Sequence, residues 1–223
     1  MNVKSLEAST AGYYDLVRHE IMPLVPKGGK RLLDVGGGEG ATVVWLKEHG
    51  YVEQAGVVDL ISPERPDARL DFHVAGNLED DAFVRRLLEQ HGPFDVILCL
   101  DVLEHLADPW SVVRRLHEAL APDGVIVASI PNIRYFEASF PLFFRGKWTL
   151  RDSGVLDRTH LRWFVKQTAC ELMTSSGLVL ERAISKPGRG RKMKWVMRAT
   201  LGLLNDFFTV QFLIRVRNRS ARF

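Results

Sequence analysis

Short apolar runs alternate with amphipathic stretches along much of this 223-residue chain. Five runs rich in Val, Ile and Leu predict buried strands; they span residues 31–35, 54–58, 70–74, 95–100 and 124–130. Three stretches with apolar residues on one face predict helices; they span residues 41–49, 80–91 and 109–120. Because alternating strands and helices build parallel sheets through crossover connections, we expect a parallel sheet with helices on both faces.

The two ends of the chain depart from this alternation. Residues 5–24 predict an N-terminal helix that ends at Pro23 and Pro26. Residues 133–164 are rich in aromatic side chains, and we expect them to form an irregular lid over the active site. A helix, a strand, a basic helix and a last strand are expected after this lid, at residues 166–176, 178–184, 192–204 and 207–216.

The first predicted strand runs directly into a glycine-rich turn that precedes a helix. Glycine occupies four positions of this turn, at Gly36, Gly37, Gly38 and Gly40. Without side chains, such a turn brings backbone N–H groups and a helix N-terminus close to a ligand. The spacing fits the dinucleotide fingerprint and also resembles the S-adenosylmethionine (SAM) loop of class I methyltransferases, so the glycines alone leave the cofactor open.

Two carboxylates near this turn narrow the choice of cofactor. Asp34 could receive the cationic ammonium of a methionine group, whereas it would repel a pyrophosphate. Asp59 follows a second apolar run, 19 residues after Gly40, and can accept both hydroxyls of a ribose. Because SAM and the nicotinamide cofactors both carry ribose, Asp59 indicates a nucleoside without deciding between them. A tight turn that binds no ligand remains the simpler alternative.

Two later segments favour SAM. D-V-L-E-H-L occupies residues 101–106, and L-x-P-D-G occupies residues 120–124. With the glycine loop, these segments resemble the class I SAM-dependent methyltransferase family over about residues 30–185. The resemblance implies one α/β domain over residues 1–223, with a Rossmann-like, doubly wound sheet of seven strands and helices on both faces. It further implies that the last strand is antiparallel and lies between the fifth and sixth.

The resemblance also implies which residues hold SAM and its product, S-adenosylhomocysteine. The glycines and Asp34 would surround the methionine and ribose, and Asp59 with its neighbour Leu60 would hold the ribose. No metal is expected, because the seven histidines are scattered and no H-x-x-x-H or paired-carboxylate motif occurs.

Further cofactor contacts would come from three other segments. Asn77 would accept from the adenine amino group and Leu78 would pack on the ring, although Asn77 could equally be a turn residue. Leu100 and Asp101 would approach from the end of the fourth strand. Tyr14 would close over the methionine end, or could equally be a core aromatic.

His105 is the first catalytic candidate. Methyl transfer depends on aligning nucleophile, methyl and sulfur, and a general base adds about 10²–10⁴-fold when the acceptor is a hydroxyl. Histidine titrates near neutral pH, and His105 follows a strand end, where the acceptor pocket should open. The pair Glu104 and His105 could instead be a structural cap for the next helix.

His160 is the second catalytic candidate. It lies in L-D-R-T-H-L-R-x-F, residues 156–164, which resembles a segment of small bacterial methyltransferases associated with glycan biosynthesis. Polar side chains in an aromatic lid can hydrogen-bond a polyol or a phosphate. We expect His160 to face the acceptor, and Arg158 with Asp157 to form a buried network that holds the lid to the sheet.

Charge is distributed unevenly. Residues 186–223 hold ten Lys or Arg and one acid, a net +9, which leaves −6 on the rest of a chain of net +3. The basic segment could contact an anionic membrane, the phosphates of an activated sugar or RNA, or it could be a solvated face. RNA is not favoured, because no aromatic-stacking module is evident. The oligomeric state is unknown.

The composition predicts a cytoplasmic protein, which could also contact the inner face of the membrane. The start of the chain has no apolar region typical of a secretory signal, no apolar run approaches about 18 residues, and only two cysteines occur.

The sequence therefore predicts a SAM-dependent methyltransferase (EC 2.1.1.-) whose acceptor is a hydroxyl of a small molecule or a glycan precursor. The alternatives are a catalytically silent scaffold with the same fold, an N-methyltransferase and, less favoured, an NAD-dependent oxidoreductase.

Overall fold

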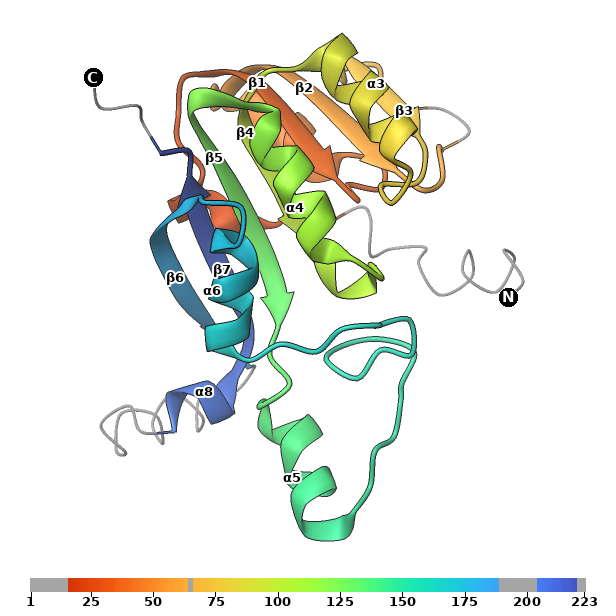
Figure 1. Cartoon of the computed structure of the whole chain (residues 1–223), viewed down its shortest axis with the longest axis vertical. Helices are drawn as coiled ribbons and strands as arrows, with labels where there is room; N and C mark the ends of the chain where they lie inside the picture. The colour runs from red at the N-terminus through yellow and green to blue at the C-terminus, as the bar shows by residue number, and fades with distance from the viewer. Residues whose placement is uncertain (1–15, 64–65, 189–203, 220–223) are drawn as a thin grey trace.

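The computed structural model describes residues 16–63, 66–188 and 204–219. Seven strands form one sheet in the order β3-β2-β1-β4-β5-β7-β6 (Figure 1). They are β1 (Gly29–Val35), β2 (Val52–Asp59), β3 (Phe72–Ala75), β4 (Phe94–Leu100), β5 (Leu120–Pro131), β6 (Val179–Pro187) and β7 (Thr209–Arg217).

The direction of the strands matches the prediction. Strands β1 to β5 run parallel to one another. Strand β7 lies between β5 and β6 and pairs antiparallel with both. The central strands are buried on both faces, which explains their nearly continuous apolar sequence. The expected mixed sheet, with the last strand between the fifth and sixth, is confirmed.

Two apolar cores lie on the two faces of this sheet. The first packs α3, α4 and α6 against it, and the second packs η1 and α2; Figure 1 shows α3, α4 and α6 in front of the strands. The helices are η1 (His19–Leu24), α2 (Ala41–Glu48), α3 (Asp81–His91), η2 (Leu103–His105), α4 (Pro109–Glu118), α5 (Phe136–Arg145), α6 (Lys166–Thr174) and α8 (Asn205–Phe208).

Local sequence fixes where α3 and α4 begin. The Asp80 carboxylate accepts from the backbone N–H groups of Ala82 and Phe83, and the Asp108 carboxylate accepts from that of Ser111. Aspartate satisfies N–H groups that have no partner inside the helix. Pro109 occupies the first turn of α4, where its missing N–H costs nothing. These two helices therefore begin within one residue of their predicted starts.

Two predicted elements, the N-terminal helix and the last strand, have other bounds in the structure. The described end of the N-terminal helix is the short 3-10 helix η1, because Pro23 lies inside it and the Arg18 backbone N–H is bound to the Thr42 hydroxyl at 3.1 Å. The last strand begins at Thr209 instead of residue 207, after the single turn α8. The predicted helix residues 5–15 and most of the basic helix at 192–204 lie outside the described residues.

The lid segment is partly helical, which the prediction missed. Its ten-residue helix α5 has apolar residues at Phe136, Phe140, Phe143 and Phe144, the spacing of one helical face. Pro141 inside the helix hid this pattern, and Ala138 is the one residue of α5 that is buried. Figure 1 shows α5 projecting away from the sheet. We call residues 133–164 the arm.

Both cysteines, Cys99 and Cys170, are unpaired, as expected. Among the described residues, no helix is both long enough and apolar enough to cross a bilayer.

Candidate active site

The parallel strands deliver their carboxyl ends to one edge of the sheet. At that edge the Gly36 N–H donates to the Val58 carbonyl at 2.7 Å, the Gly76 N–H to the Asp59 carbonyl at 2.8 Å, and the Asp101 N–H to the Ser129 carbonyl at 3.1 Å. The turns that follow β1, β2, β3 and β4 therefore lie side by side. Ligands of open α/β sheets bind outside such ends, so this edge is the candidate site.

The glycine turn is closely packed, and two of its glycines show why side chains are excluded. A Cβ on Gly37 would lie 2.7 Å from the carboxyl carbon of Asp34. Gly40 has φ +85°, and a Cβ there would lie 3.0 Å from Leu70 and Val57 side chains. Gly40 also caps α2, so the turn needs a left-handed residue without a side chain at that position.

Asp34 lies buried beneath this turn. Asp34 is only 3% exposed, and its Oδ1 has no hydrogen-bond partner among the described residues. Burial, and then the nearby charge of Asp59, raises the pKa of Asp34 to about 8. A cationic donor would satisfy the orphaned oxygen and favour the carboxylate, so Asp34 fits an ammonium better than a phosphate.

Asp59 holds the turn to β2. Its Oδ2 accepts from the Gly38 N–H at 2.8 Å, and its Oδ1 lies 3.4 Å from the Ile61 N–H. His73 Nε2 donates to the Gly38 carbonyl at 2.8 Å, so both backbone polar groups of Gly38 are held. A carboxylate accepts about four hydrogen bonds, so Asp59 retains lone pairs for a ribose diol. His73 was not predicted, because no motif marks it.

The adenine contacts remain predictions. Asn77 is exposed, and its Oδ1 accepts from the Glu79 N–H at 2.9 Å, which favours the turn role. Leu78 is 7% exposed and packs in the first core, whereas Leu60 is 70% exposed. Leu100 is half-buried at the end of β4. Tyr14 lies outside the described residues.

Asp101 is held in a strained conformation beside the glycine turn. It is the one residue other than glycine with a positive φ, +57°, among the described residues. Its carboxylate accepts from Arg18 Nη1 at 2.8 Å, from the Ser129 hydroxyl at 2.9 Å and from Gln211 Nε2 at 2.7 Å. Such strain persists where the surroundings over-determine it, and it is concentrated at functional sites.

The contacts of Asp101 extend into a polar network that links the chain start to β6 and β7. Lys186 Nζ donates to Gln211 Oε1 at 2.9 Å and to Glu20 Oε1 at 2.8 Å, and Arg18 Nε donates to Glu20 at 2.7 Å. Burial would raise the pKa of Glu20, but hydrogen bonds from Lys186 and Arg18 lower it to about 2. No sequence motif marks this network, because its members are scattered along the chain.

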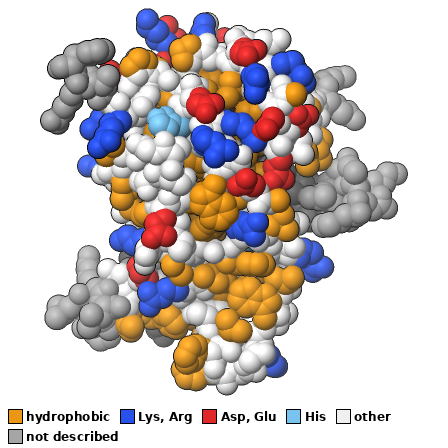
Figure 2. All heavy atoms as spheres, viewed as in Figure 1, with side chains coloured by type: hydrophobic (Ala, Val, Ile, Leu, Met, Phe, Trp, Pro, Cys, Tyr) orange, Lys and Arg blue, Asp and Glu red, His pale blue; other side chains and the backbone are white. Residues whose placement is uncertain are grey.

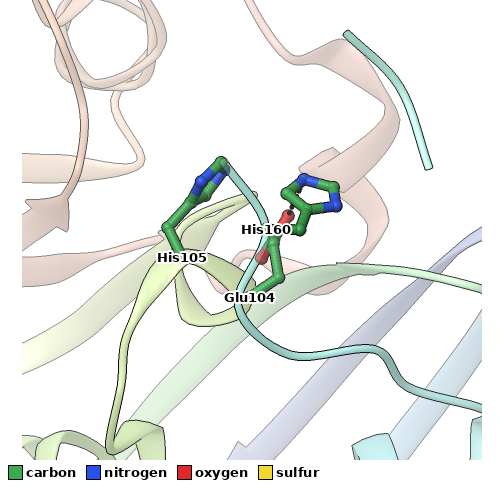
Figure 3. A group of neighbouring side chains, drawn as sticks. All are labelled: Glu104, His105 and His160. Atoms are coloured by element: carbon green, nitrogen blue, oxygen red, sulfur yellow. Dashed lines mark ion pairs between the residues drawn. The ribbon is translucent and has the colours of Figure 1, made fainter. Parts of the chain in front are cut away.

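A second cluster lies where the arm returns to η2. Glu104 and His105 come from η2, and His160 comes from the arm (Figure 3). The two imidazole rings meet edge to face, with their centroids 4.7 Å apart. The Leu161 and Arg162 N–H groups both donate to the Glu104 carbonyl, at 2.8 and 3.0 Å. The structure therefore brings together both predicted catalytic histidines.

Hydrogen bonds around His105 determine which of its nitrogens carries a proton. His105 Nδ1 lies 3.0 Å from the Thr159 hydroxyl and 3.3 Å from the Thr159 carbonyl. That hydroxyl donates its single proton to Asp157 Oδ1 at 2.7 Å. Both groups facing Nδ1 therefore act as acceptors, so Nδ1 carries the N–H and the lone pair of the neutral ring resides on Nε2.

Glu104 and His160 are both shifted toward their neutral forms. Burial, and then the charge of Asp101, raises the pKa of Glu104 well above its usual range, and both of its oxygens lack hydrogen-bond partners among the described residues. Burial, and then His105, lowers the pKa of His160. His160 Nε2 lies 3.9 Å from Glu104 Oε1, which is within ion-pair range. Both pKa shifts oppose the charged forms that an ion pair would need.

One expectation about the arm is wrong. Arg158 does not form a buried network with Asp157: its side chain is 55% exposed and pairs with Asp152 at 2.7 Å. Asp157 instead accepts hydrogen bonds from the backbone N–H and the hydroxyl of Thr159. The arm is held to η2 by the backbone hydrogen bonds from Leu161 and Arg162 to the Glu104 carbonyl.

Glu104, His105 and His160 could also offer one metal-ligand atom each, within 4.8 Å of one another, and they are the one such group found among the described residues. Sequence spacing had given no hint of it, since 55 residues separate the two histidines.

Comparison with known proteins shows the family of this chain. A family model described as a methyltransferase domain matches residues 10–183. The chain is 33% identical over 109 residues to the ubiquinone biosynthesis O-methyltransferase of Pseudomonas aeruginosa strain LESB58, a match that covers 47% of this chain and 45% of the relative. It is 33% identical over 127 residues to the same-named protein of Azotobacter vinelandii, covering 51% and 53%. The match thus spans about half the length of these curated relatives.

Solved structures show the same fold over nearly the whole chain. A SAM-dependent methyltransferase from Archaeoglobus fulgidus aligns with a TM-score of 0.62 at 17% identity, covering 97% of this chain and 100% of that one. The N-methyltransferase NodS from Bradyrhizobium japonicum WM9, in complex with S-adenosyl-L-homocysteine, aligns with a TM-score of 0.59 at 16% identity, covering 96% and 97%. At such identities the likeness concerns the fold. The match over residues 10–183, on a sheet of this order with this glycine turn, places the chain in the methyltransferase-domain family, as a class I SAM-dependent methyltransferase.

Proposed function

We propose that this methyltransferase transfers a methyl group from SAM to a hydroxyl of a small molecule or a glycan precursor, with His105 as the general base. The observation that carries this proposal is the chain Asp157–Thr159–His105, which leaves the imidazole lone pair on Nε2. A base is useful for a hydroxyl acceptor, whose proton must leave as the new bond forms.

The glycine turn and two carboxylates would hold the cofactor. Asp59, already bound to the Gly38 N–H, would accept from the ribose hydroxyls, and the orphaned oxygen of Asp34 would face the methionine ammonium. When bound, SAM supplies a methyl group on a sulfonium sulfur. The sulfur keeps the carbon–sulfur electron pair as the methyl group is transferred. Because the glycines of the turn carry no side chains, the cofactor can approach the backbone of the turn closely.

His105 would accept the proton of the acceptor hydroxyl on Nε2 as its oxygen bonds to the methyl carbon. The resulting imidazolium would keep its Nδ1–H on Thr159, and the Asp157 carboxylate behind that hydroxyl would stabilise the positive charge. His160 would support the ring of His105 by its edge-to-face contact. Since His160 is 8% exposed, we assign it a positioning role next to the base.

The relatives support an oxygen acceptor, because the curated proteins that match half of this chain are named O-methyltransferases. The rival is an N-methyltransferase, a class that includes the structural neighbour NodS. An amine acceptor would need no base once it is deprotonated, so the oriented His105 favours oxygen. Membrane contact through the basic C-terminus stays a prediction, because residues 189–203 lie outside the described part of the chain.

Titration calorimetry tests the cofactor half of the proposal. Wild type should bind SAM and S-adenosylhomocysteine with micromolar affinity and NAD not at all, and Asp59→Ala should weaken SAM binding at least tenfold. Absence of SAM binding in the wild type would contradict the proposal and favour a scaffold protein.

Methyl-labelled SAM tests the acceptor half. Incubation with matched alcohol, phenol, sugar and amine acceptors should give labelled methyl ethers, identified by mass spectrometry. Labelled methylamines alone would transfer the assignment to nitrogen.

A further inference from the structure

Exposed apolar side chains are concentrated on the arm. Eight of the fourteen large apolar side chains exposed among the described residues lie between residues 140 and 163. Phe143 is 86% exposed and Phe144 is 70% exposed. Figure 2 shows hydrophobic side chains gathered over the lower end of the molecule, where α5 lies. A soluble surface rarely exposes a patch of this kind unless it contacts a partner or a lipid.

Two cations adjoin these phenylalanines and have no acidic partner. Arg145 is the last residue of α5, and Lys147 lies two residues after it. Neither side chain makes an ion pair or a hydrogen bond among the described residues. By contrast, Arg151 and Arg158 elsewhere on the arm pair with Glu137 and Asp152. The apolar tip therefore carries positive charge that no described side chain neutralises.

A basic stretch of the sequence lies between β6 and α8. Residues 189–203 contain five Lys or Arg and no acid. The chain reaches this segment through Gly188, whose N–H donates to the Phe208 carbonyl at 3.0 Å, and leaves it just before α8. Phe207 and Phe208 of α8 pack on Phe136 at the start of α5, with ring centroids 6.1 and 5.9 Å apart. The described residues on either side of this segment, Gly188 and those of α8, therefore lie beside the start of the arm.

We propose that the tip of α5, with Phe143, Phe144, Arg145 and Lys147, inserts into the interface of an anionic lipid bilayer. Aromatic side chains beside unpaired cations suit the boundary between acyl chains and anionic headgroups. A protein partner with a mixed or neutral surface would leave Arg145 and Lys147 unpaired.

Sedimentation with lipid vesicles tests this surface directly. The full chain should bind vesicles of phosphatidylglycerol and phosphatidylcholine at least tenfold more tightly than vesicles of phosphatidylcholine alone, and added salt should weaken the binding. Phe143→Ser combined with Phe144→Ser should reduce binding at least tenfold, and Arg145→Glu combined with Lys147→Glu should reduce it similarly. Equal binding to both vesicle types, or full binding by the Phe143 and Phe144 variant, would overturn the proposal.

Matched variants away from the arm control for composition. Trp110→Ser removes an exposed aromatic of α4, and Arg85→Glu with Arg86→Glu makes the same charge change on exposed positions of α3. Both should bind vesicles as the wild type does. SAM affinity measures folding and is independent of lipid. If the wild type ignores vesicles but forms a dimer that the Phe143 and Phe144 variant lacks, the patch joins two copies and the lipid proposal fails.

Discussion

The two halves of the site each bury a carboxyl group, but they assemble it in different ways. On the cofactor side, Asp34 lies beneath a turn only a few residues further along the chain. On the acceptor side, Glu104 lies beneath a pair of histidines that the chain brings together from η2 and the arm. Burial raises the pKa of both carboxyls, and a second acid adds to each shift, Asp59 for the first and Asp101 for the second.

The comparison separates binding from chemistry. The cofactor side offers the buried carboxyl group of Asp34 and the backbone of the glycine turn. This arrangement suits tight binding of a cationic nucleoside. The acceptor side offers an imidazole that the hydroxyl of Thr159 orients, which suits proton transfer. Changes on the first side should therefore alter affinity for SAM, whereas changes on the second should alter turnover.

The largest effect is expected at the base. His105→Asn should lower kcat for a hydroxyl acceptor by about 10²–10⁴-fold, because it removes the proton acceptor. Its affinity for SAM, measured by calorimetry, should stay within twofold of the wild type. His49→Asn, at an exposed histidine after α2, is the control and should leave both quantities unchanged. A loss of less than threefold in kcat would mean that alignment alone drives the transfer.

The next effect is expected at the turn. Gly40→Ala forces a side chain into a left-handed position 3.0 Å from Leu70 and Val57, and should weaken SAM binding at least tenfold. Gly50 has a similar φ of +70° with nothing within 4 Å, so Gly50→Ala should cost only the conformational strain of about 1 kcal/mol and leave SAM affinity intact. Equal losses of affinity in both variants would show that strain, and not the cradle, sets the binding.

Sequence reasoning reached the cofactor side more completely than the acceptor side. The parallel strands and the positions of Asp34 and Asp59 at their ends follow from short segments whose pattern survives in isolation, whereas the place of the last strand came from the family resemblance. Thr159 acts on a residue 54 positions away, and Arg18 on one 83 positions away, so no local pattern could indicate them. The helix α5 could have been found from its apolar spacing, but Pro141 and its sparse burial obscured it.

A smaller effect is expected from the relay behind the base. Thr159→Val keeps the shape of the side chain but removes the hydroxyl, while the Thr159 carbonyl still lies 3.3 Å from His105 Nδ1. We therefore expect kcat to fall about threefold to tenfold, with a shift in the pH dependence of kcat/KM, which reports the protonation of the free enzyme. Thr168→Val, at an exposed threonine of α6, is the control. An unchanged pH profile would remove Thr159 from the proton path.

The smallest effect tests whether the cofactor compensates for the buried carboxyl. A carboxyl with a pKa of about 4 in the unfolded chain and about 8 in the folded protein prefers its protonated form when folded. Its contribution to stability is therefore greatest below pH 4 and is lost as the pH rises toward 8. Asp34→Asn cannot ionise, so its unfolding free energy should fall less than that of the wild type between pH 5 and pH 8.5.

Saturating SAM distinguishes the two halves of the site in the same measurement. If the methionine ammonium meets Asp34, SAM should recover most of the wild-type loss at pH 8.5 and stabilise Asp34→Asn less. Glu104→Gln should also flatten the pH dependence, because burial raises the pKa of Glu104 as well. Its stabilisation by SAM should match that of the wild type, since Glu104 lies with the histidines and not beneath the glycine turn. Equal stabilisation of all three proteins by SAM would contradict an ammonium at Asp34 and leave its raised pKa as a purely structural cost of burial.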